Sequence, residues 1–113
     1  MLGLANKAGK LVSGDETVRN SIRQGKVKLL IISEDASENT CKRFVNTSVF
    51  YKVEYIQWGK KELLGYYIGK SERSVVGILD DSFSRNILEL IGHALKQKED
   101  NEQNAGGELF EQN

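Results

Sequence analysis

The run from Lys26 to Ser33 constrains the fold more than any other part of this 113-residue chain. Its centre holds four consecutive apolar residues, Leu29 to Ile32, with no polar position between them. A strand with one solvated face alternates apolar and polar residues, whereas a continuous apolar run is typical of a strand buried on both faces. The run therefore predicts a central strand, of the kind found in parallel sheets, with both of its faces covered.

Extended and helical patterns alternate along the first 95 residues. Besides the central strand, extended segments are expected at residues 11–12, 52–56 and 75–79. Helices are expected at residues 1–7, 13–24, around 41–49, at 60–67 and from 81 or 82 to 95. Strands that alternate with helices predict an α/β protein with helices on both faces of a mainly parallel or mixed sheet. In such sheets, sites form beyond the carboxyl ends of strands, and residues 33–37 lie at one such edge.

The second helix has the most distinctive start. Ser13 and Glu16 have the spacing of a capping box, in which each side chain accepts a hydrogen bond from the other residue's backbone. Val18 and Ile22 stand four apart and are expected to share the buried face, and Gly25 is expected to end the helix. Backbone N–H groups and the positive dipole end at this start suit a phosphate or a nucleobase edge. A capped surface helix without a ligand is the alternative.

Three further helices are each expected to bury one apolar face. The residues of these faces are Cys41, Phe44, Val45 and Val49; Leu63, Leu64 and Tyr67; and Phe83, Ile87, Leu90, Ile91, Ala94 and Leu95. The expected cap is Asp35 or Ser37 for the first of these three helices, and Asp81 or Ser82 for the last. Core packing is favoured over base stacking for Tyr51, Tyr55, Tyr66 and Tyr67, while both roles stay open for Trp58.

Length and charge indicate one domain followed by a tail. Residues 1–95 are expected to form a single folded domain, with 14 Lys and Arg against 11 Asp and Glu. Residues 96–113 hold 2 against 5, and are expected to be an acidic, disordered tail. The folded part is only mildly basic, which argues against broad electrostatic binding of RNA. No run is long enough for a membrane span, and the single Cys41 fits a reducing cytoplasm, where a monomer is expected.

Catalytic and metal-binding chemistry is not expected. Gly69-Lys70-Ser71 is similar to the end of a phosphate-binding P-loop, but three residues separate Gly65 from Gly69 where the motif needs four. One Cys and one His are too few for a typical zinc site, and His93 is expected on the polar side of the last helix. No catalytic residue, metal or cofactor is therefore expected, and nucleotide turnover is kept only as a weaker alternative.

Three stretches, together with the helix between the first two, carry a family resemblance. They are Lys-Ala-Gly-Lys-Leu-Val-Ser-Gly (residues 7–14), Lys-Leu-Leu-Ile-Ile-Ser-Glu-Asp-Ala-Ser (28–37) and Glu-Leu-Leu-Gly-Tyr-Tyr-Ile-Gly (62–69). In this order they resemble the kink-turn RNA-binding ribosomal proteins of the L7Ae and L30e type, especially the bacterial members, over residues 3 to about 95. The resemblance implies a three-layer α/β/α sandwich around a mixed four-stranded sheet, no catalysis, and structured RNA as partner, on the ribosome or elsewhere.

The resemblance also implies where RNA binds. The start of the second helix would enter the major groove at tandem sheared G·A pairs, and the loop before the last strand would pack against a base flipped out of the kink. The implied RNA-binding residues are Lys10, facing the phosphates, then Gly14, Asp15, Glu16, Thr17, Arg19, Asn20 and Arg23 on the helix, Asp35, Ala36 and Ser37 in the turn, and Ile68, Gly69, Lys70, Ser71, Glu72 and Arg73 in the loop.

The helix start departs from the family's usual pattern, Gly-x-Asn-Glu-x-x-Lys. Glu16, Thr17 and Asn20 stand where the family has Asn, Glu and Lys. Lys70 replaces an apolar residue beside the flipped base. A good bidentate base contact contributes roughly 1–3 kcal/mol, so the loss of two would weaken binding roughly 30-fold or more unless neighbours compensate. A protein-interaction module with an altered RNA-binding face is therefore the alternative function.

Overall fold

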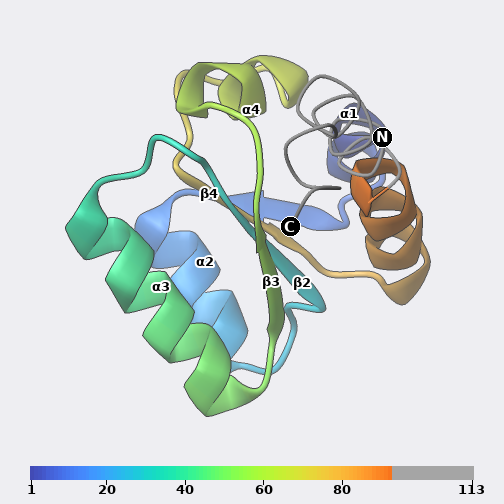
Figure 1. Ribbon diagram of the computed structural model, residues 1–113. Helices are drawn as coiled ribbons and strands as arrows, with labels where there is room; N and C mark the ends of the chain where they lie inside the picture. The colour runs from blue at the N-terminus through green and yellow to red at the C-terminus, as the bar shows by residue number, and fades with distance from the viewer. Residues whose placement is uncertain (93–113) are drawn as a thin grey trace, which may run out of the picture.

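The computed structural model describes residues 1–92, in which helices and strands alternate (Figure 1). The helices are α1 (Leu2–Lys7), α2 (Asp15–Arg23), α3 (Glu38–Tyr51), α4 (Lys61–Tyr67) and a last helix over residues 81–92. The strands are β1 (Leu11–Ser13), β2 (Leu29–Ile32), β3 (Glu54–Gln57) and β4 (Val75–Ile78). The predicted order of elements is confirmed. The predictions for His93, Ala94, Leu95 and the tail lie outside the described residues.

The four strands form one mixed sheet in the order β1-β4-β2-β3. Strand β2 pairs in parallel with β3 and antiparallel with β4, and β1 pairs antiparallel with β4. All four residues of β2 are buried, which confirms the central strand expected from the continuous apolar run. The sheet is mixed because β2 and β3 are parallel, whereas β4 runs antiparallel to both of its neighbours.

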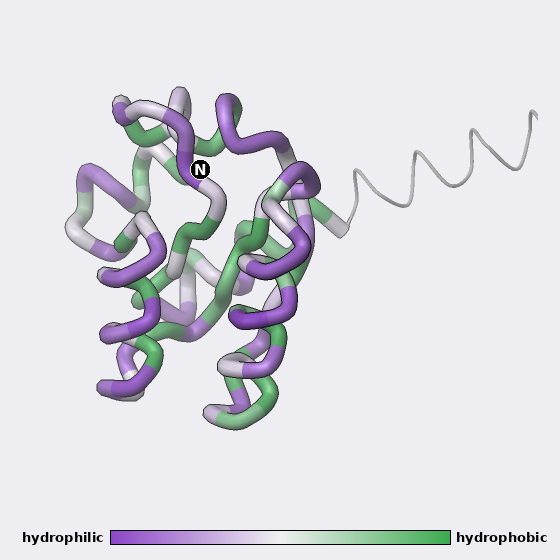
Figure 2. Tube along the Cα trace, turned by 90° about the vertical axis from the view of Figure 1, so that its left-hand side faces the viewer, coloured by the Kyte–Doolittle hydropathy of each residue, from purple (hydrophilic) through white to green (hydrophobic). Residues whose placement is uncertain are grey.

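Successive residues of β2 point to opposite faces of the sheet, and each face has its own core. Leu29 and Ile31 belong to a core that also contains residues of α1, α4 and the last helix. Leu30 and Ile32 belong to a second core, which α2 and α3 close. Figure 1 shows α2 and α3 on one side of the sheet and α1 and the last helix on the other. In Figure 2, hydrophilic and hydrophobic segments alternate along the helical turns, as expected for helices with one buried face. The α/β/α sandwich is thus confirmed.

The predicted capping box at Ser13 is wrong. Ser13 ends β1 and pairs with Val76, so the backbone of Ser13 belongs to the sheet and the helix begins later. The N-cap of α2 is Gly14, at φ 92° and ψ 149°, and no side chain caps this helix end. A backbone with this positive φ is accessible to glycine and strained for other residues. The predicted end of the helix at Gly25 is confirmed, because Gly25 has a φ of 74° directly after the C-cap.

Two other cap predictions have different outcomes. Ser37 caps α3 as predicted, because its side chain accepts a hydrogen bond of 3.1 Å from the backbone N–H of Thr40. At the last helix, the predicted cap, Asp81 or Ser82, is wrong by one or two positions. Asp80 is the capping side chain, since its Oδ2 accepts a hydrogen bond of 3.0 Å from the backbone N–H of Phe83.

The predicted apolar faces of α3, α4 and the last helix each include one residue that is exposed in the structure. On α3, Phe44 is buried, but Val49 is 65% exposed and Ser48, one turn after Phe44, is buried instead. The exposed members of the other faces are Tyr67 on α4 and Leu90 on the last helix, whose neighbours Leu64, Ile87 and Ile91 are buried. Core packing is also wrong for the four tyrosines, which are all exposed. Trp58 packs at the edge of the core, with its ring stacked 6.5 Å from that of Tyr67.

Candidate nucleic-acid interface

Three segments far apart in the sequence meet at one edge of the sheet: the start of α2, the turn after β2 and the loop before β4. The Ser33 N–H donates to the Ser74 carbonyl at 2.8 Å, which joins the turn to the loop. The Gly14 N–H donates to the Val75 carbonyl at 3.2 Å, which joins the start of α2 to the same strand end. Helices α2 and α3 both begin at this edge and run in the same direction (Figure 1). The edge therefore unites most of the residues implied by the family resemblance.

The start of α2 presents backbone donors. The Val18 N–H makes the first intrahelical hydrogen bond, to the Gly14 carbonyl at 3.0 Å. Within residues 1–92, the N–H groups of Asp15, Glu16 and Thr17 have no acceptor. The side chains of Glu16, Thr17 and Asn20 are exposed beside these N–H groups. All three are among the RNA-binding residues that the family resemblance implies. Unpaired N–H groups and the positive end of the helix dipole together favour an anionic ligand.

Asp15 lies between two arginines. Its Oδ2 is 2.7 Å from Arg43 Nη2, across the contact between α2 and α3. Its Oδ1 is 3.5 Å from Arg19 Nε, one turn along α2. The carboxylate is thus already occupied by cations, so its role as a direct base-binding group competes with two ion pairs.

The loop from Ile68 to Arg73 is held close to α4. Gly65 lets the loop backbone approach the helix, because a Cβ there would overlap the Ser71 carbonyl. Gly69 turns the chain with a φ of 70°. The side chain of Ile68 is only 5% exposed and belongs to the core, so it cannot pack against a flipped base in this conformation. The exposed members of the loop are Gly69, Lys70, Ser71 and Glu72.

Arg73 ties this loop to the neighbouring strand. Its Nε donates to Ser13 Oγ at 3.2 Å. Its Nη1 donates to Ser71 Oγ and to the Glu72 carbonyl, both at 2.9 Å. The guanidinium therefore fixes the loop relative to the start of α2, in addition to placing a positive charge between them.

The turn after β2 connects two helix starts. Asp35 Oδ1 accepts a hydrogen bond of 2.8 Å from the backbone N–H of Lys61, the first residue of α4. This hydrogen bond lowers the pKa of Asp35 below its ordinary value. Ser37 caps α3, and Ala36 packs partly buried against the core between α2 and α3. Asp35 and Ser37 thus already have backbone partners, which positions the turn.

Two implied residues do not reach this edge. Lys10 precedes β1, and its carbonyl accepts a hydrogen bond from the Leu79 N–H, beyond the far end of β4. Arg23 is the last residue of α2, about 12 Å along the helix axis from Asp15 at 1.5 Å per residue. The structure therefore places Lys10 and Arg23 apart from the other implied residues.

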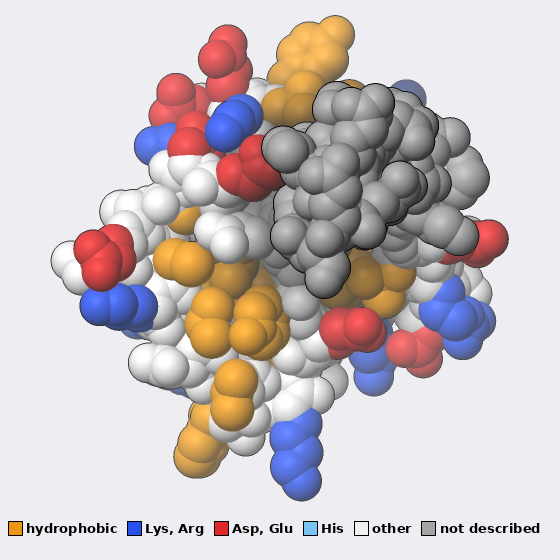
Figure 3. Space-filling view, viewed as in Figure 1, with side chains coloured by type: hydrophobic (Ala, Val, Ile, Leu, Met, Phe, Trp, Pro, Cys, Tyr) orange, Lys and Arg blue, Asp and Glu red, His pale blue; other side chains and the backbone are white. Residues whose placement is uncertain are grey.

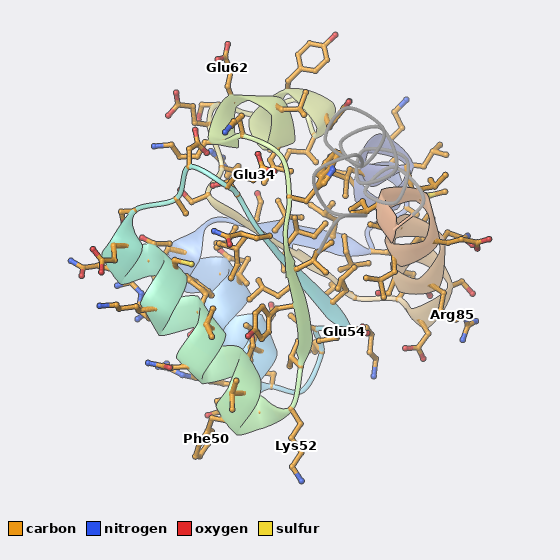
Figure 4. The ribbon with its side chains drawn as sticks, in the orientation of Figure 1. Glu34, Phe50, Lys52, Glu54, Glu62 and Arg85 are labelled. Atoms are coloured by element: carbon orange, nitrogen blue, oxygen red, sulfur yellow. The ribbon has the colours of Figure 1, made fainter. Side chains whose placement is uncertain are left out.

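Charges of both signs surround the edge. Lys60 Nζ lies 3.4 Å from Glu34 Oε2, and acidic and basic side chains are interspersed over α4 (Figure 3). In Figure 4, Glu34 lies near α4 and Glu62, whereas Glu54 lies at the other end of the β2–β3 pair. Sequence reasoning missed the edge cations Arg43, Lys60 and Lys61. No local pattern singles out Arg43, because its contact with α2 spans 28 residues of sequence.

Other kinds of site find little support in the described part of the chain. Residues 1–92 contain no group of three or more His, Cys, Asp or Glu side chains that could hold a metal ion. No helix among these residues is long and apolar enough to cross a membrane. An apolar hollow of about 230 Å³ lies between α1, α4 and the last helix, and its lining includes Trp58, Tyr67 and Ile87.

Comparison with known proteins gives the family. Residues 1–88 match the family described as "Ribosomal protein L7Ae/L30e/S12e/Gadd45 family". The chain belongs to this family, as the sequence resemblance indicated.

Individual relatives agree with this assignment. The chain is 41% identical over 91 residues to "RNA-binding protein YlxQ" of Bacillus subtilis (strain 168), covering 80% of this chain and 91% of that protein. It is 31% identical over 102 residues to "Large ribosomal subunit protein eL8" of Picrophilus torridus, covering 86% and 80%. A solved structure of a protein of unknown function from Bacillus halodurans C has a TM-score of 0.77 and 38% identity, covering 80% of this chain and 92% of that one.

Proposed function

We propose that this protein is a non-catalytic, cytoplasmic RNA-binding protein that recognises kink-turn RNA through the edge formed by α2, the turn after β2 and the loop before β4. The observation that carries the proposal is the start of α2, where three N–H groups without acceptors within residues 1–92 lie beside exposed polar side chains. Such a helix start binds anionic groups such as phosphates, and the exposed polar side chains beside it can reach base edges.

The loop completes the proposed interface. Lys70 and Ser71 are exposed, and Arg73 holds the loop next to the strand that leads into α2. Helix start and loop lie at one edge, so a compactly folded RNA such as a kink-turn can contact both segments at once. The protein would bind the kinked RNA better than the extended form and shift that equilibrium toward the kink.

Relatives support the RNA partner. The Bacillus subtilis relative is named an RNA-binding protein, and the Picrophilus torridus relative is named a large ribosomal subunit protein. The family description also names ribosomal proteins. On this basis we expect ribosomal RNA to be among the ligands and the protein to act as a monomer on it.

A gel-shift titration tests the proposal. One duplex contains a kink-turn with tandem sheared G·A pairs, and a matched duplex has those pairs replaced by Watson–Crick pairs. The expected result is at least tenfold tighter binding of the kink-turn duplex, because the replacement removes both the kink and the exposed base edges. Equal affinity for the two duplexes would refute kink-turn recognition, and no binding to either would refute the RNA partner.

One observation favours the alternative, a protein-interaction module. Four large apolar or aromatic side chains are exposed near the C-terminal end of α3 and on the edge strand β3: Val49, Phe50, Tyr51 and Tyr55. Hydrophobic side chains gather on this face in Figure 3. Exposed apolar surface of this kind marks contact sites for other proteins. A purified protein partner that stays bound after nuclease treatment, and is released by Phe50→Ser, would favour this alternative.

A further inference from the structure

Arg43 connects the middle of α3 to the first residue of α2. Its Nη2 lies 2.7 Å from Asp15 Oδ2 and 3.5 Å from Thr40 Oγ1. The Arg43 side chain is 43% exposed and that of Asp15 is 40% exposed, so the pair lies at the surface. These contacts hold the guanidinium beside the helix start that offers unpaired N–H groups.

The Asp15 carboxylate is outnumbered by the cations it contacts, although Glu16 in the same turn of α2 adds a second, exposed carboxylate. One carboxylate faces two guanidiniums, those of Arg19 and Arg43, next to the positive end of the α2 dipole. An arginine has five N–H donors, and the two hydrogen bonds that the Arg43 side chain donates within residues 1–92 both use Nη2. Its Nε and Nη1 remain available for a second anion. A planar guanidinium oriented by one carboxylate can bind a phosphate with its other edge.

We infer that Arg43 is a phosphate-binding residue of the RNA interface, with Asp15 as the residue that orients it. The inference rests on the proposed function and extends the interface from α2 onto α3. The ligand class is the phosphate backbone of the RNA strand that passes the start of α2. In this arrangement Asp15 acts through Arg43 instead of contacting a base.

The chain offers a matched control on the same helix. Lys42 is the adjacent residue, has the same charge, is exposed, and pairs with Glu38 at 3.1 Å, one turn earlier on α3, instead of with Asp15. The variants Arg43→Ala and Lys42→Ala change the net charge equally, so any general effect of charge is the same in both. Arg43→Gln removes the charge but retains a donor for Asp15, which guards against a structural effect of Arg43→Ala.

The experiment measures the dissociation constant for kink-turn RNA against salt concentration. For Arg43→Ala and Arg43→Gln, we expect binding about tenfold weaker and a salt slope reduced by about 0.7–0.9, the loss of one phosphate contact. For Lys42→Ala, we expect the slope of the unmodified protein. Equal slopes for the Arg43 and Lys42 variants would overturn the inference while leaving RNA binding intact. Failure of the unmodified protein to bind would overturn the proposed function, and with it the role of Arg43.

Discussion

Replacement of Gly65 by alanine is expected to displace the loop of the proposed interface. A Cβ at this position would overlap the Ser71 carbonyl oxygen and lie 2.6 Å from its carbonyl carbon and 3.0 Å from the Lys70 carbonyl oxygen. All three atoms belong to the backbone, so no side-chain rotation relieves the clash. The loop and α4 must separate, which also strains the hydrogen bond of 2.8 Å from the Lys70 N–H to the Gly65 carbonyl.

The expected loss of unfolding free energy in Gly65→Ala can be taken from the cost of overpacking in other proteins. Insertion of a methyl group into a tightly packed site costs about 1–3 kcal/mol in the free energy of unfolding. For a folded part of this size, about 2 kcal/mol corresponds to a fall in melting temperature of about 8–16 °C. Gly65→Ala should also weaken binding of kink-turn RNA at a temperature where the variant is fully folded, because the loop no longer lies beside α2.

Thermal melting followed by circular dichroism, together with gel-shift titration, provides the assay. Gly92→Ala is the matched control, since a Cβ at Gly92 in the last helix meets no atom of residues 1–92 within 4 Å. Alanine in a helix is favoured over glycine by up to about 1 kcal/mol, so the control should melt at the same or a slightly higher temperature. If Gly65→Ala melted and bound RNA like the control, the close approach of loop and helix would be refuted.

The remaining predictions concern three polar residues. Asn20→Ala should weaken RNA binding severalfold with an unchanged melting temperature, because Asn20 is exposed and makes no hydrogen bond with its side chain in residues 1–92; a fall in both would assign Asn20 to the fold. Arg73→Ala should lower both the affinity for RNA and the melting temperature, because the Arg73 guanidinium holds the loop through three partners. Melting curves of this variant, compared with those of Asn20→Ala, test this. The pKa of Asp35 is depressed by the Lys61 N–H, so its contribution to stability is present above its ordinary pKa near 3.8 and is lost as pH falls through the lowered value. Asp35→Asn should therefore reduce the loss of unfolding free energy as the pH falls, measured by denaturant titration at several acidic pH values. The same pH dependence in the variant and the unmodified protein would contradict this role of Asp35.

Local patterns in the sequence predicted the sheet and its layers well. The apolar run of β2 predicted burial on both faces because a strand buried between two helical layers has no position for a polar side chain. Val18 and Ile22 were correctly placed on the buried face of α2, since their four-residue spacing puts them on one side of a helix.

Long-range contacts account for the failures. Ser13 has a capping residue's type and spacing, but its backbone is taken up by pairing with β4, more than 60 residues away. Ser48 is buried and Val49 exposed because Ser48 lies one turn after Phe44 on the packed face of α3, a position at which residue type alone favours neither burial nor a polar surface role. Arg43 was missed because its partner lies on another helix.

The central claim is that the start of α2 and the loop before β4 bind RNA together. Nuclear magnetic resonance titration of the ¹⁵N-labelled protein with kink-turn RNA tests this claim most directly. The account predicts the largest changes in amide chemical shift at residues 15–17 and 69–73, with little change at residues 49–55. Large changes at residues 49–55 with none at residues 15–17 would contradict it.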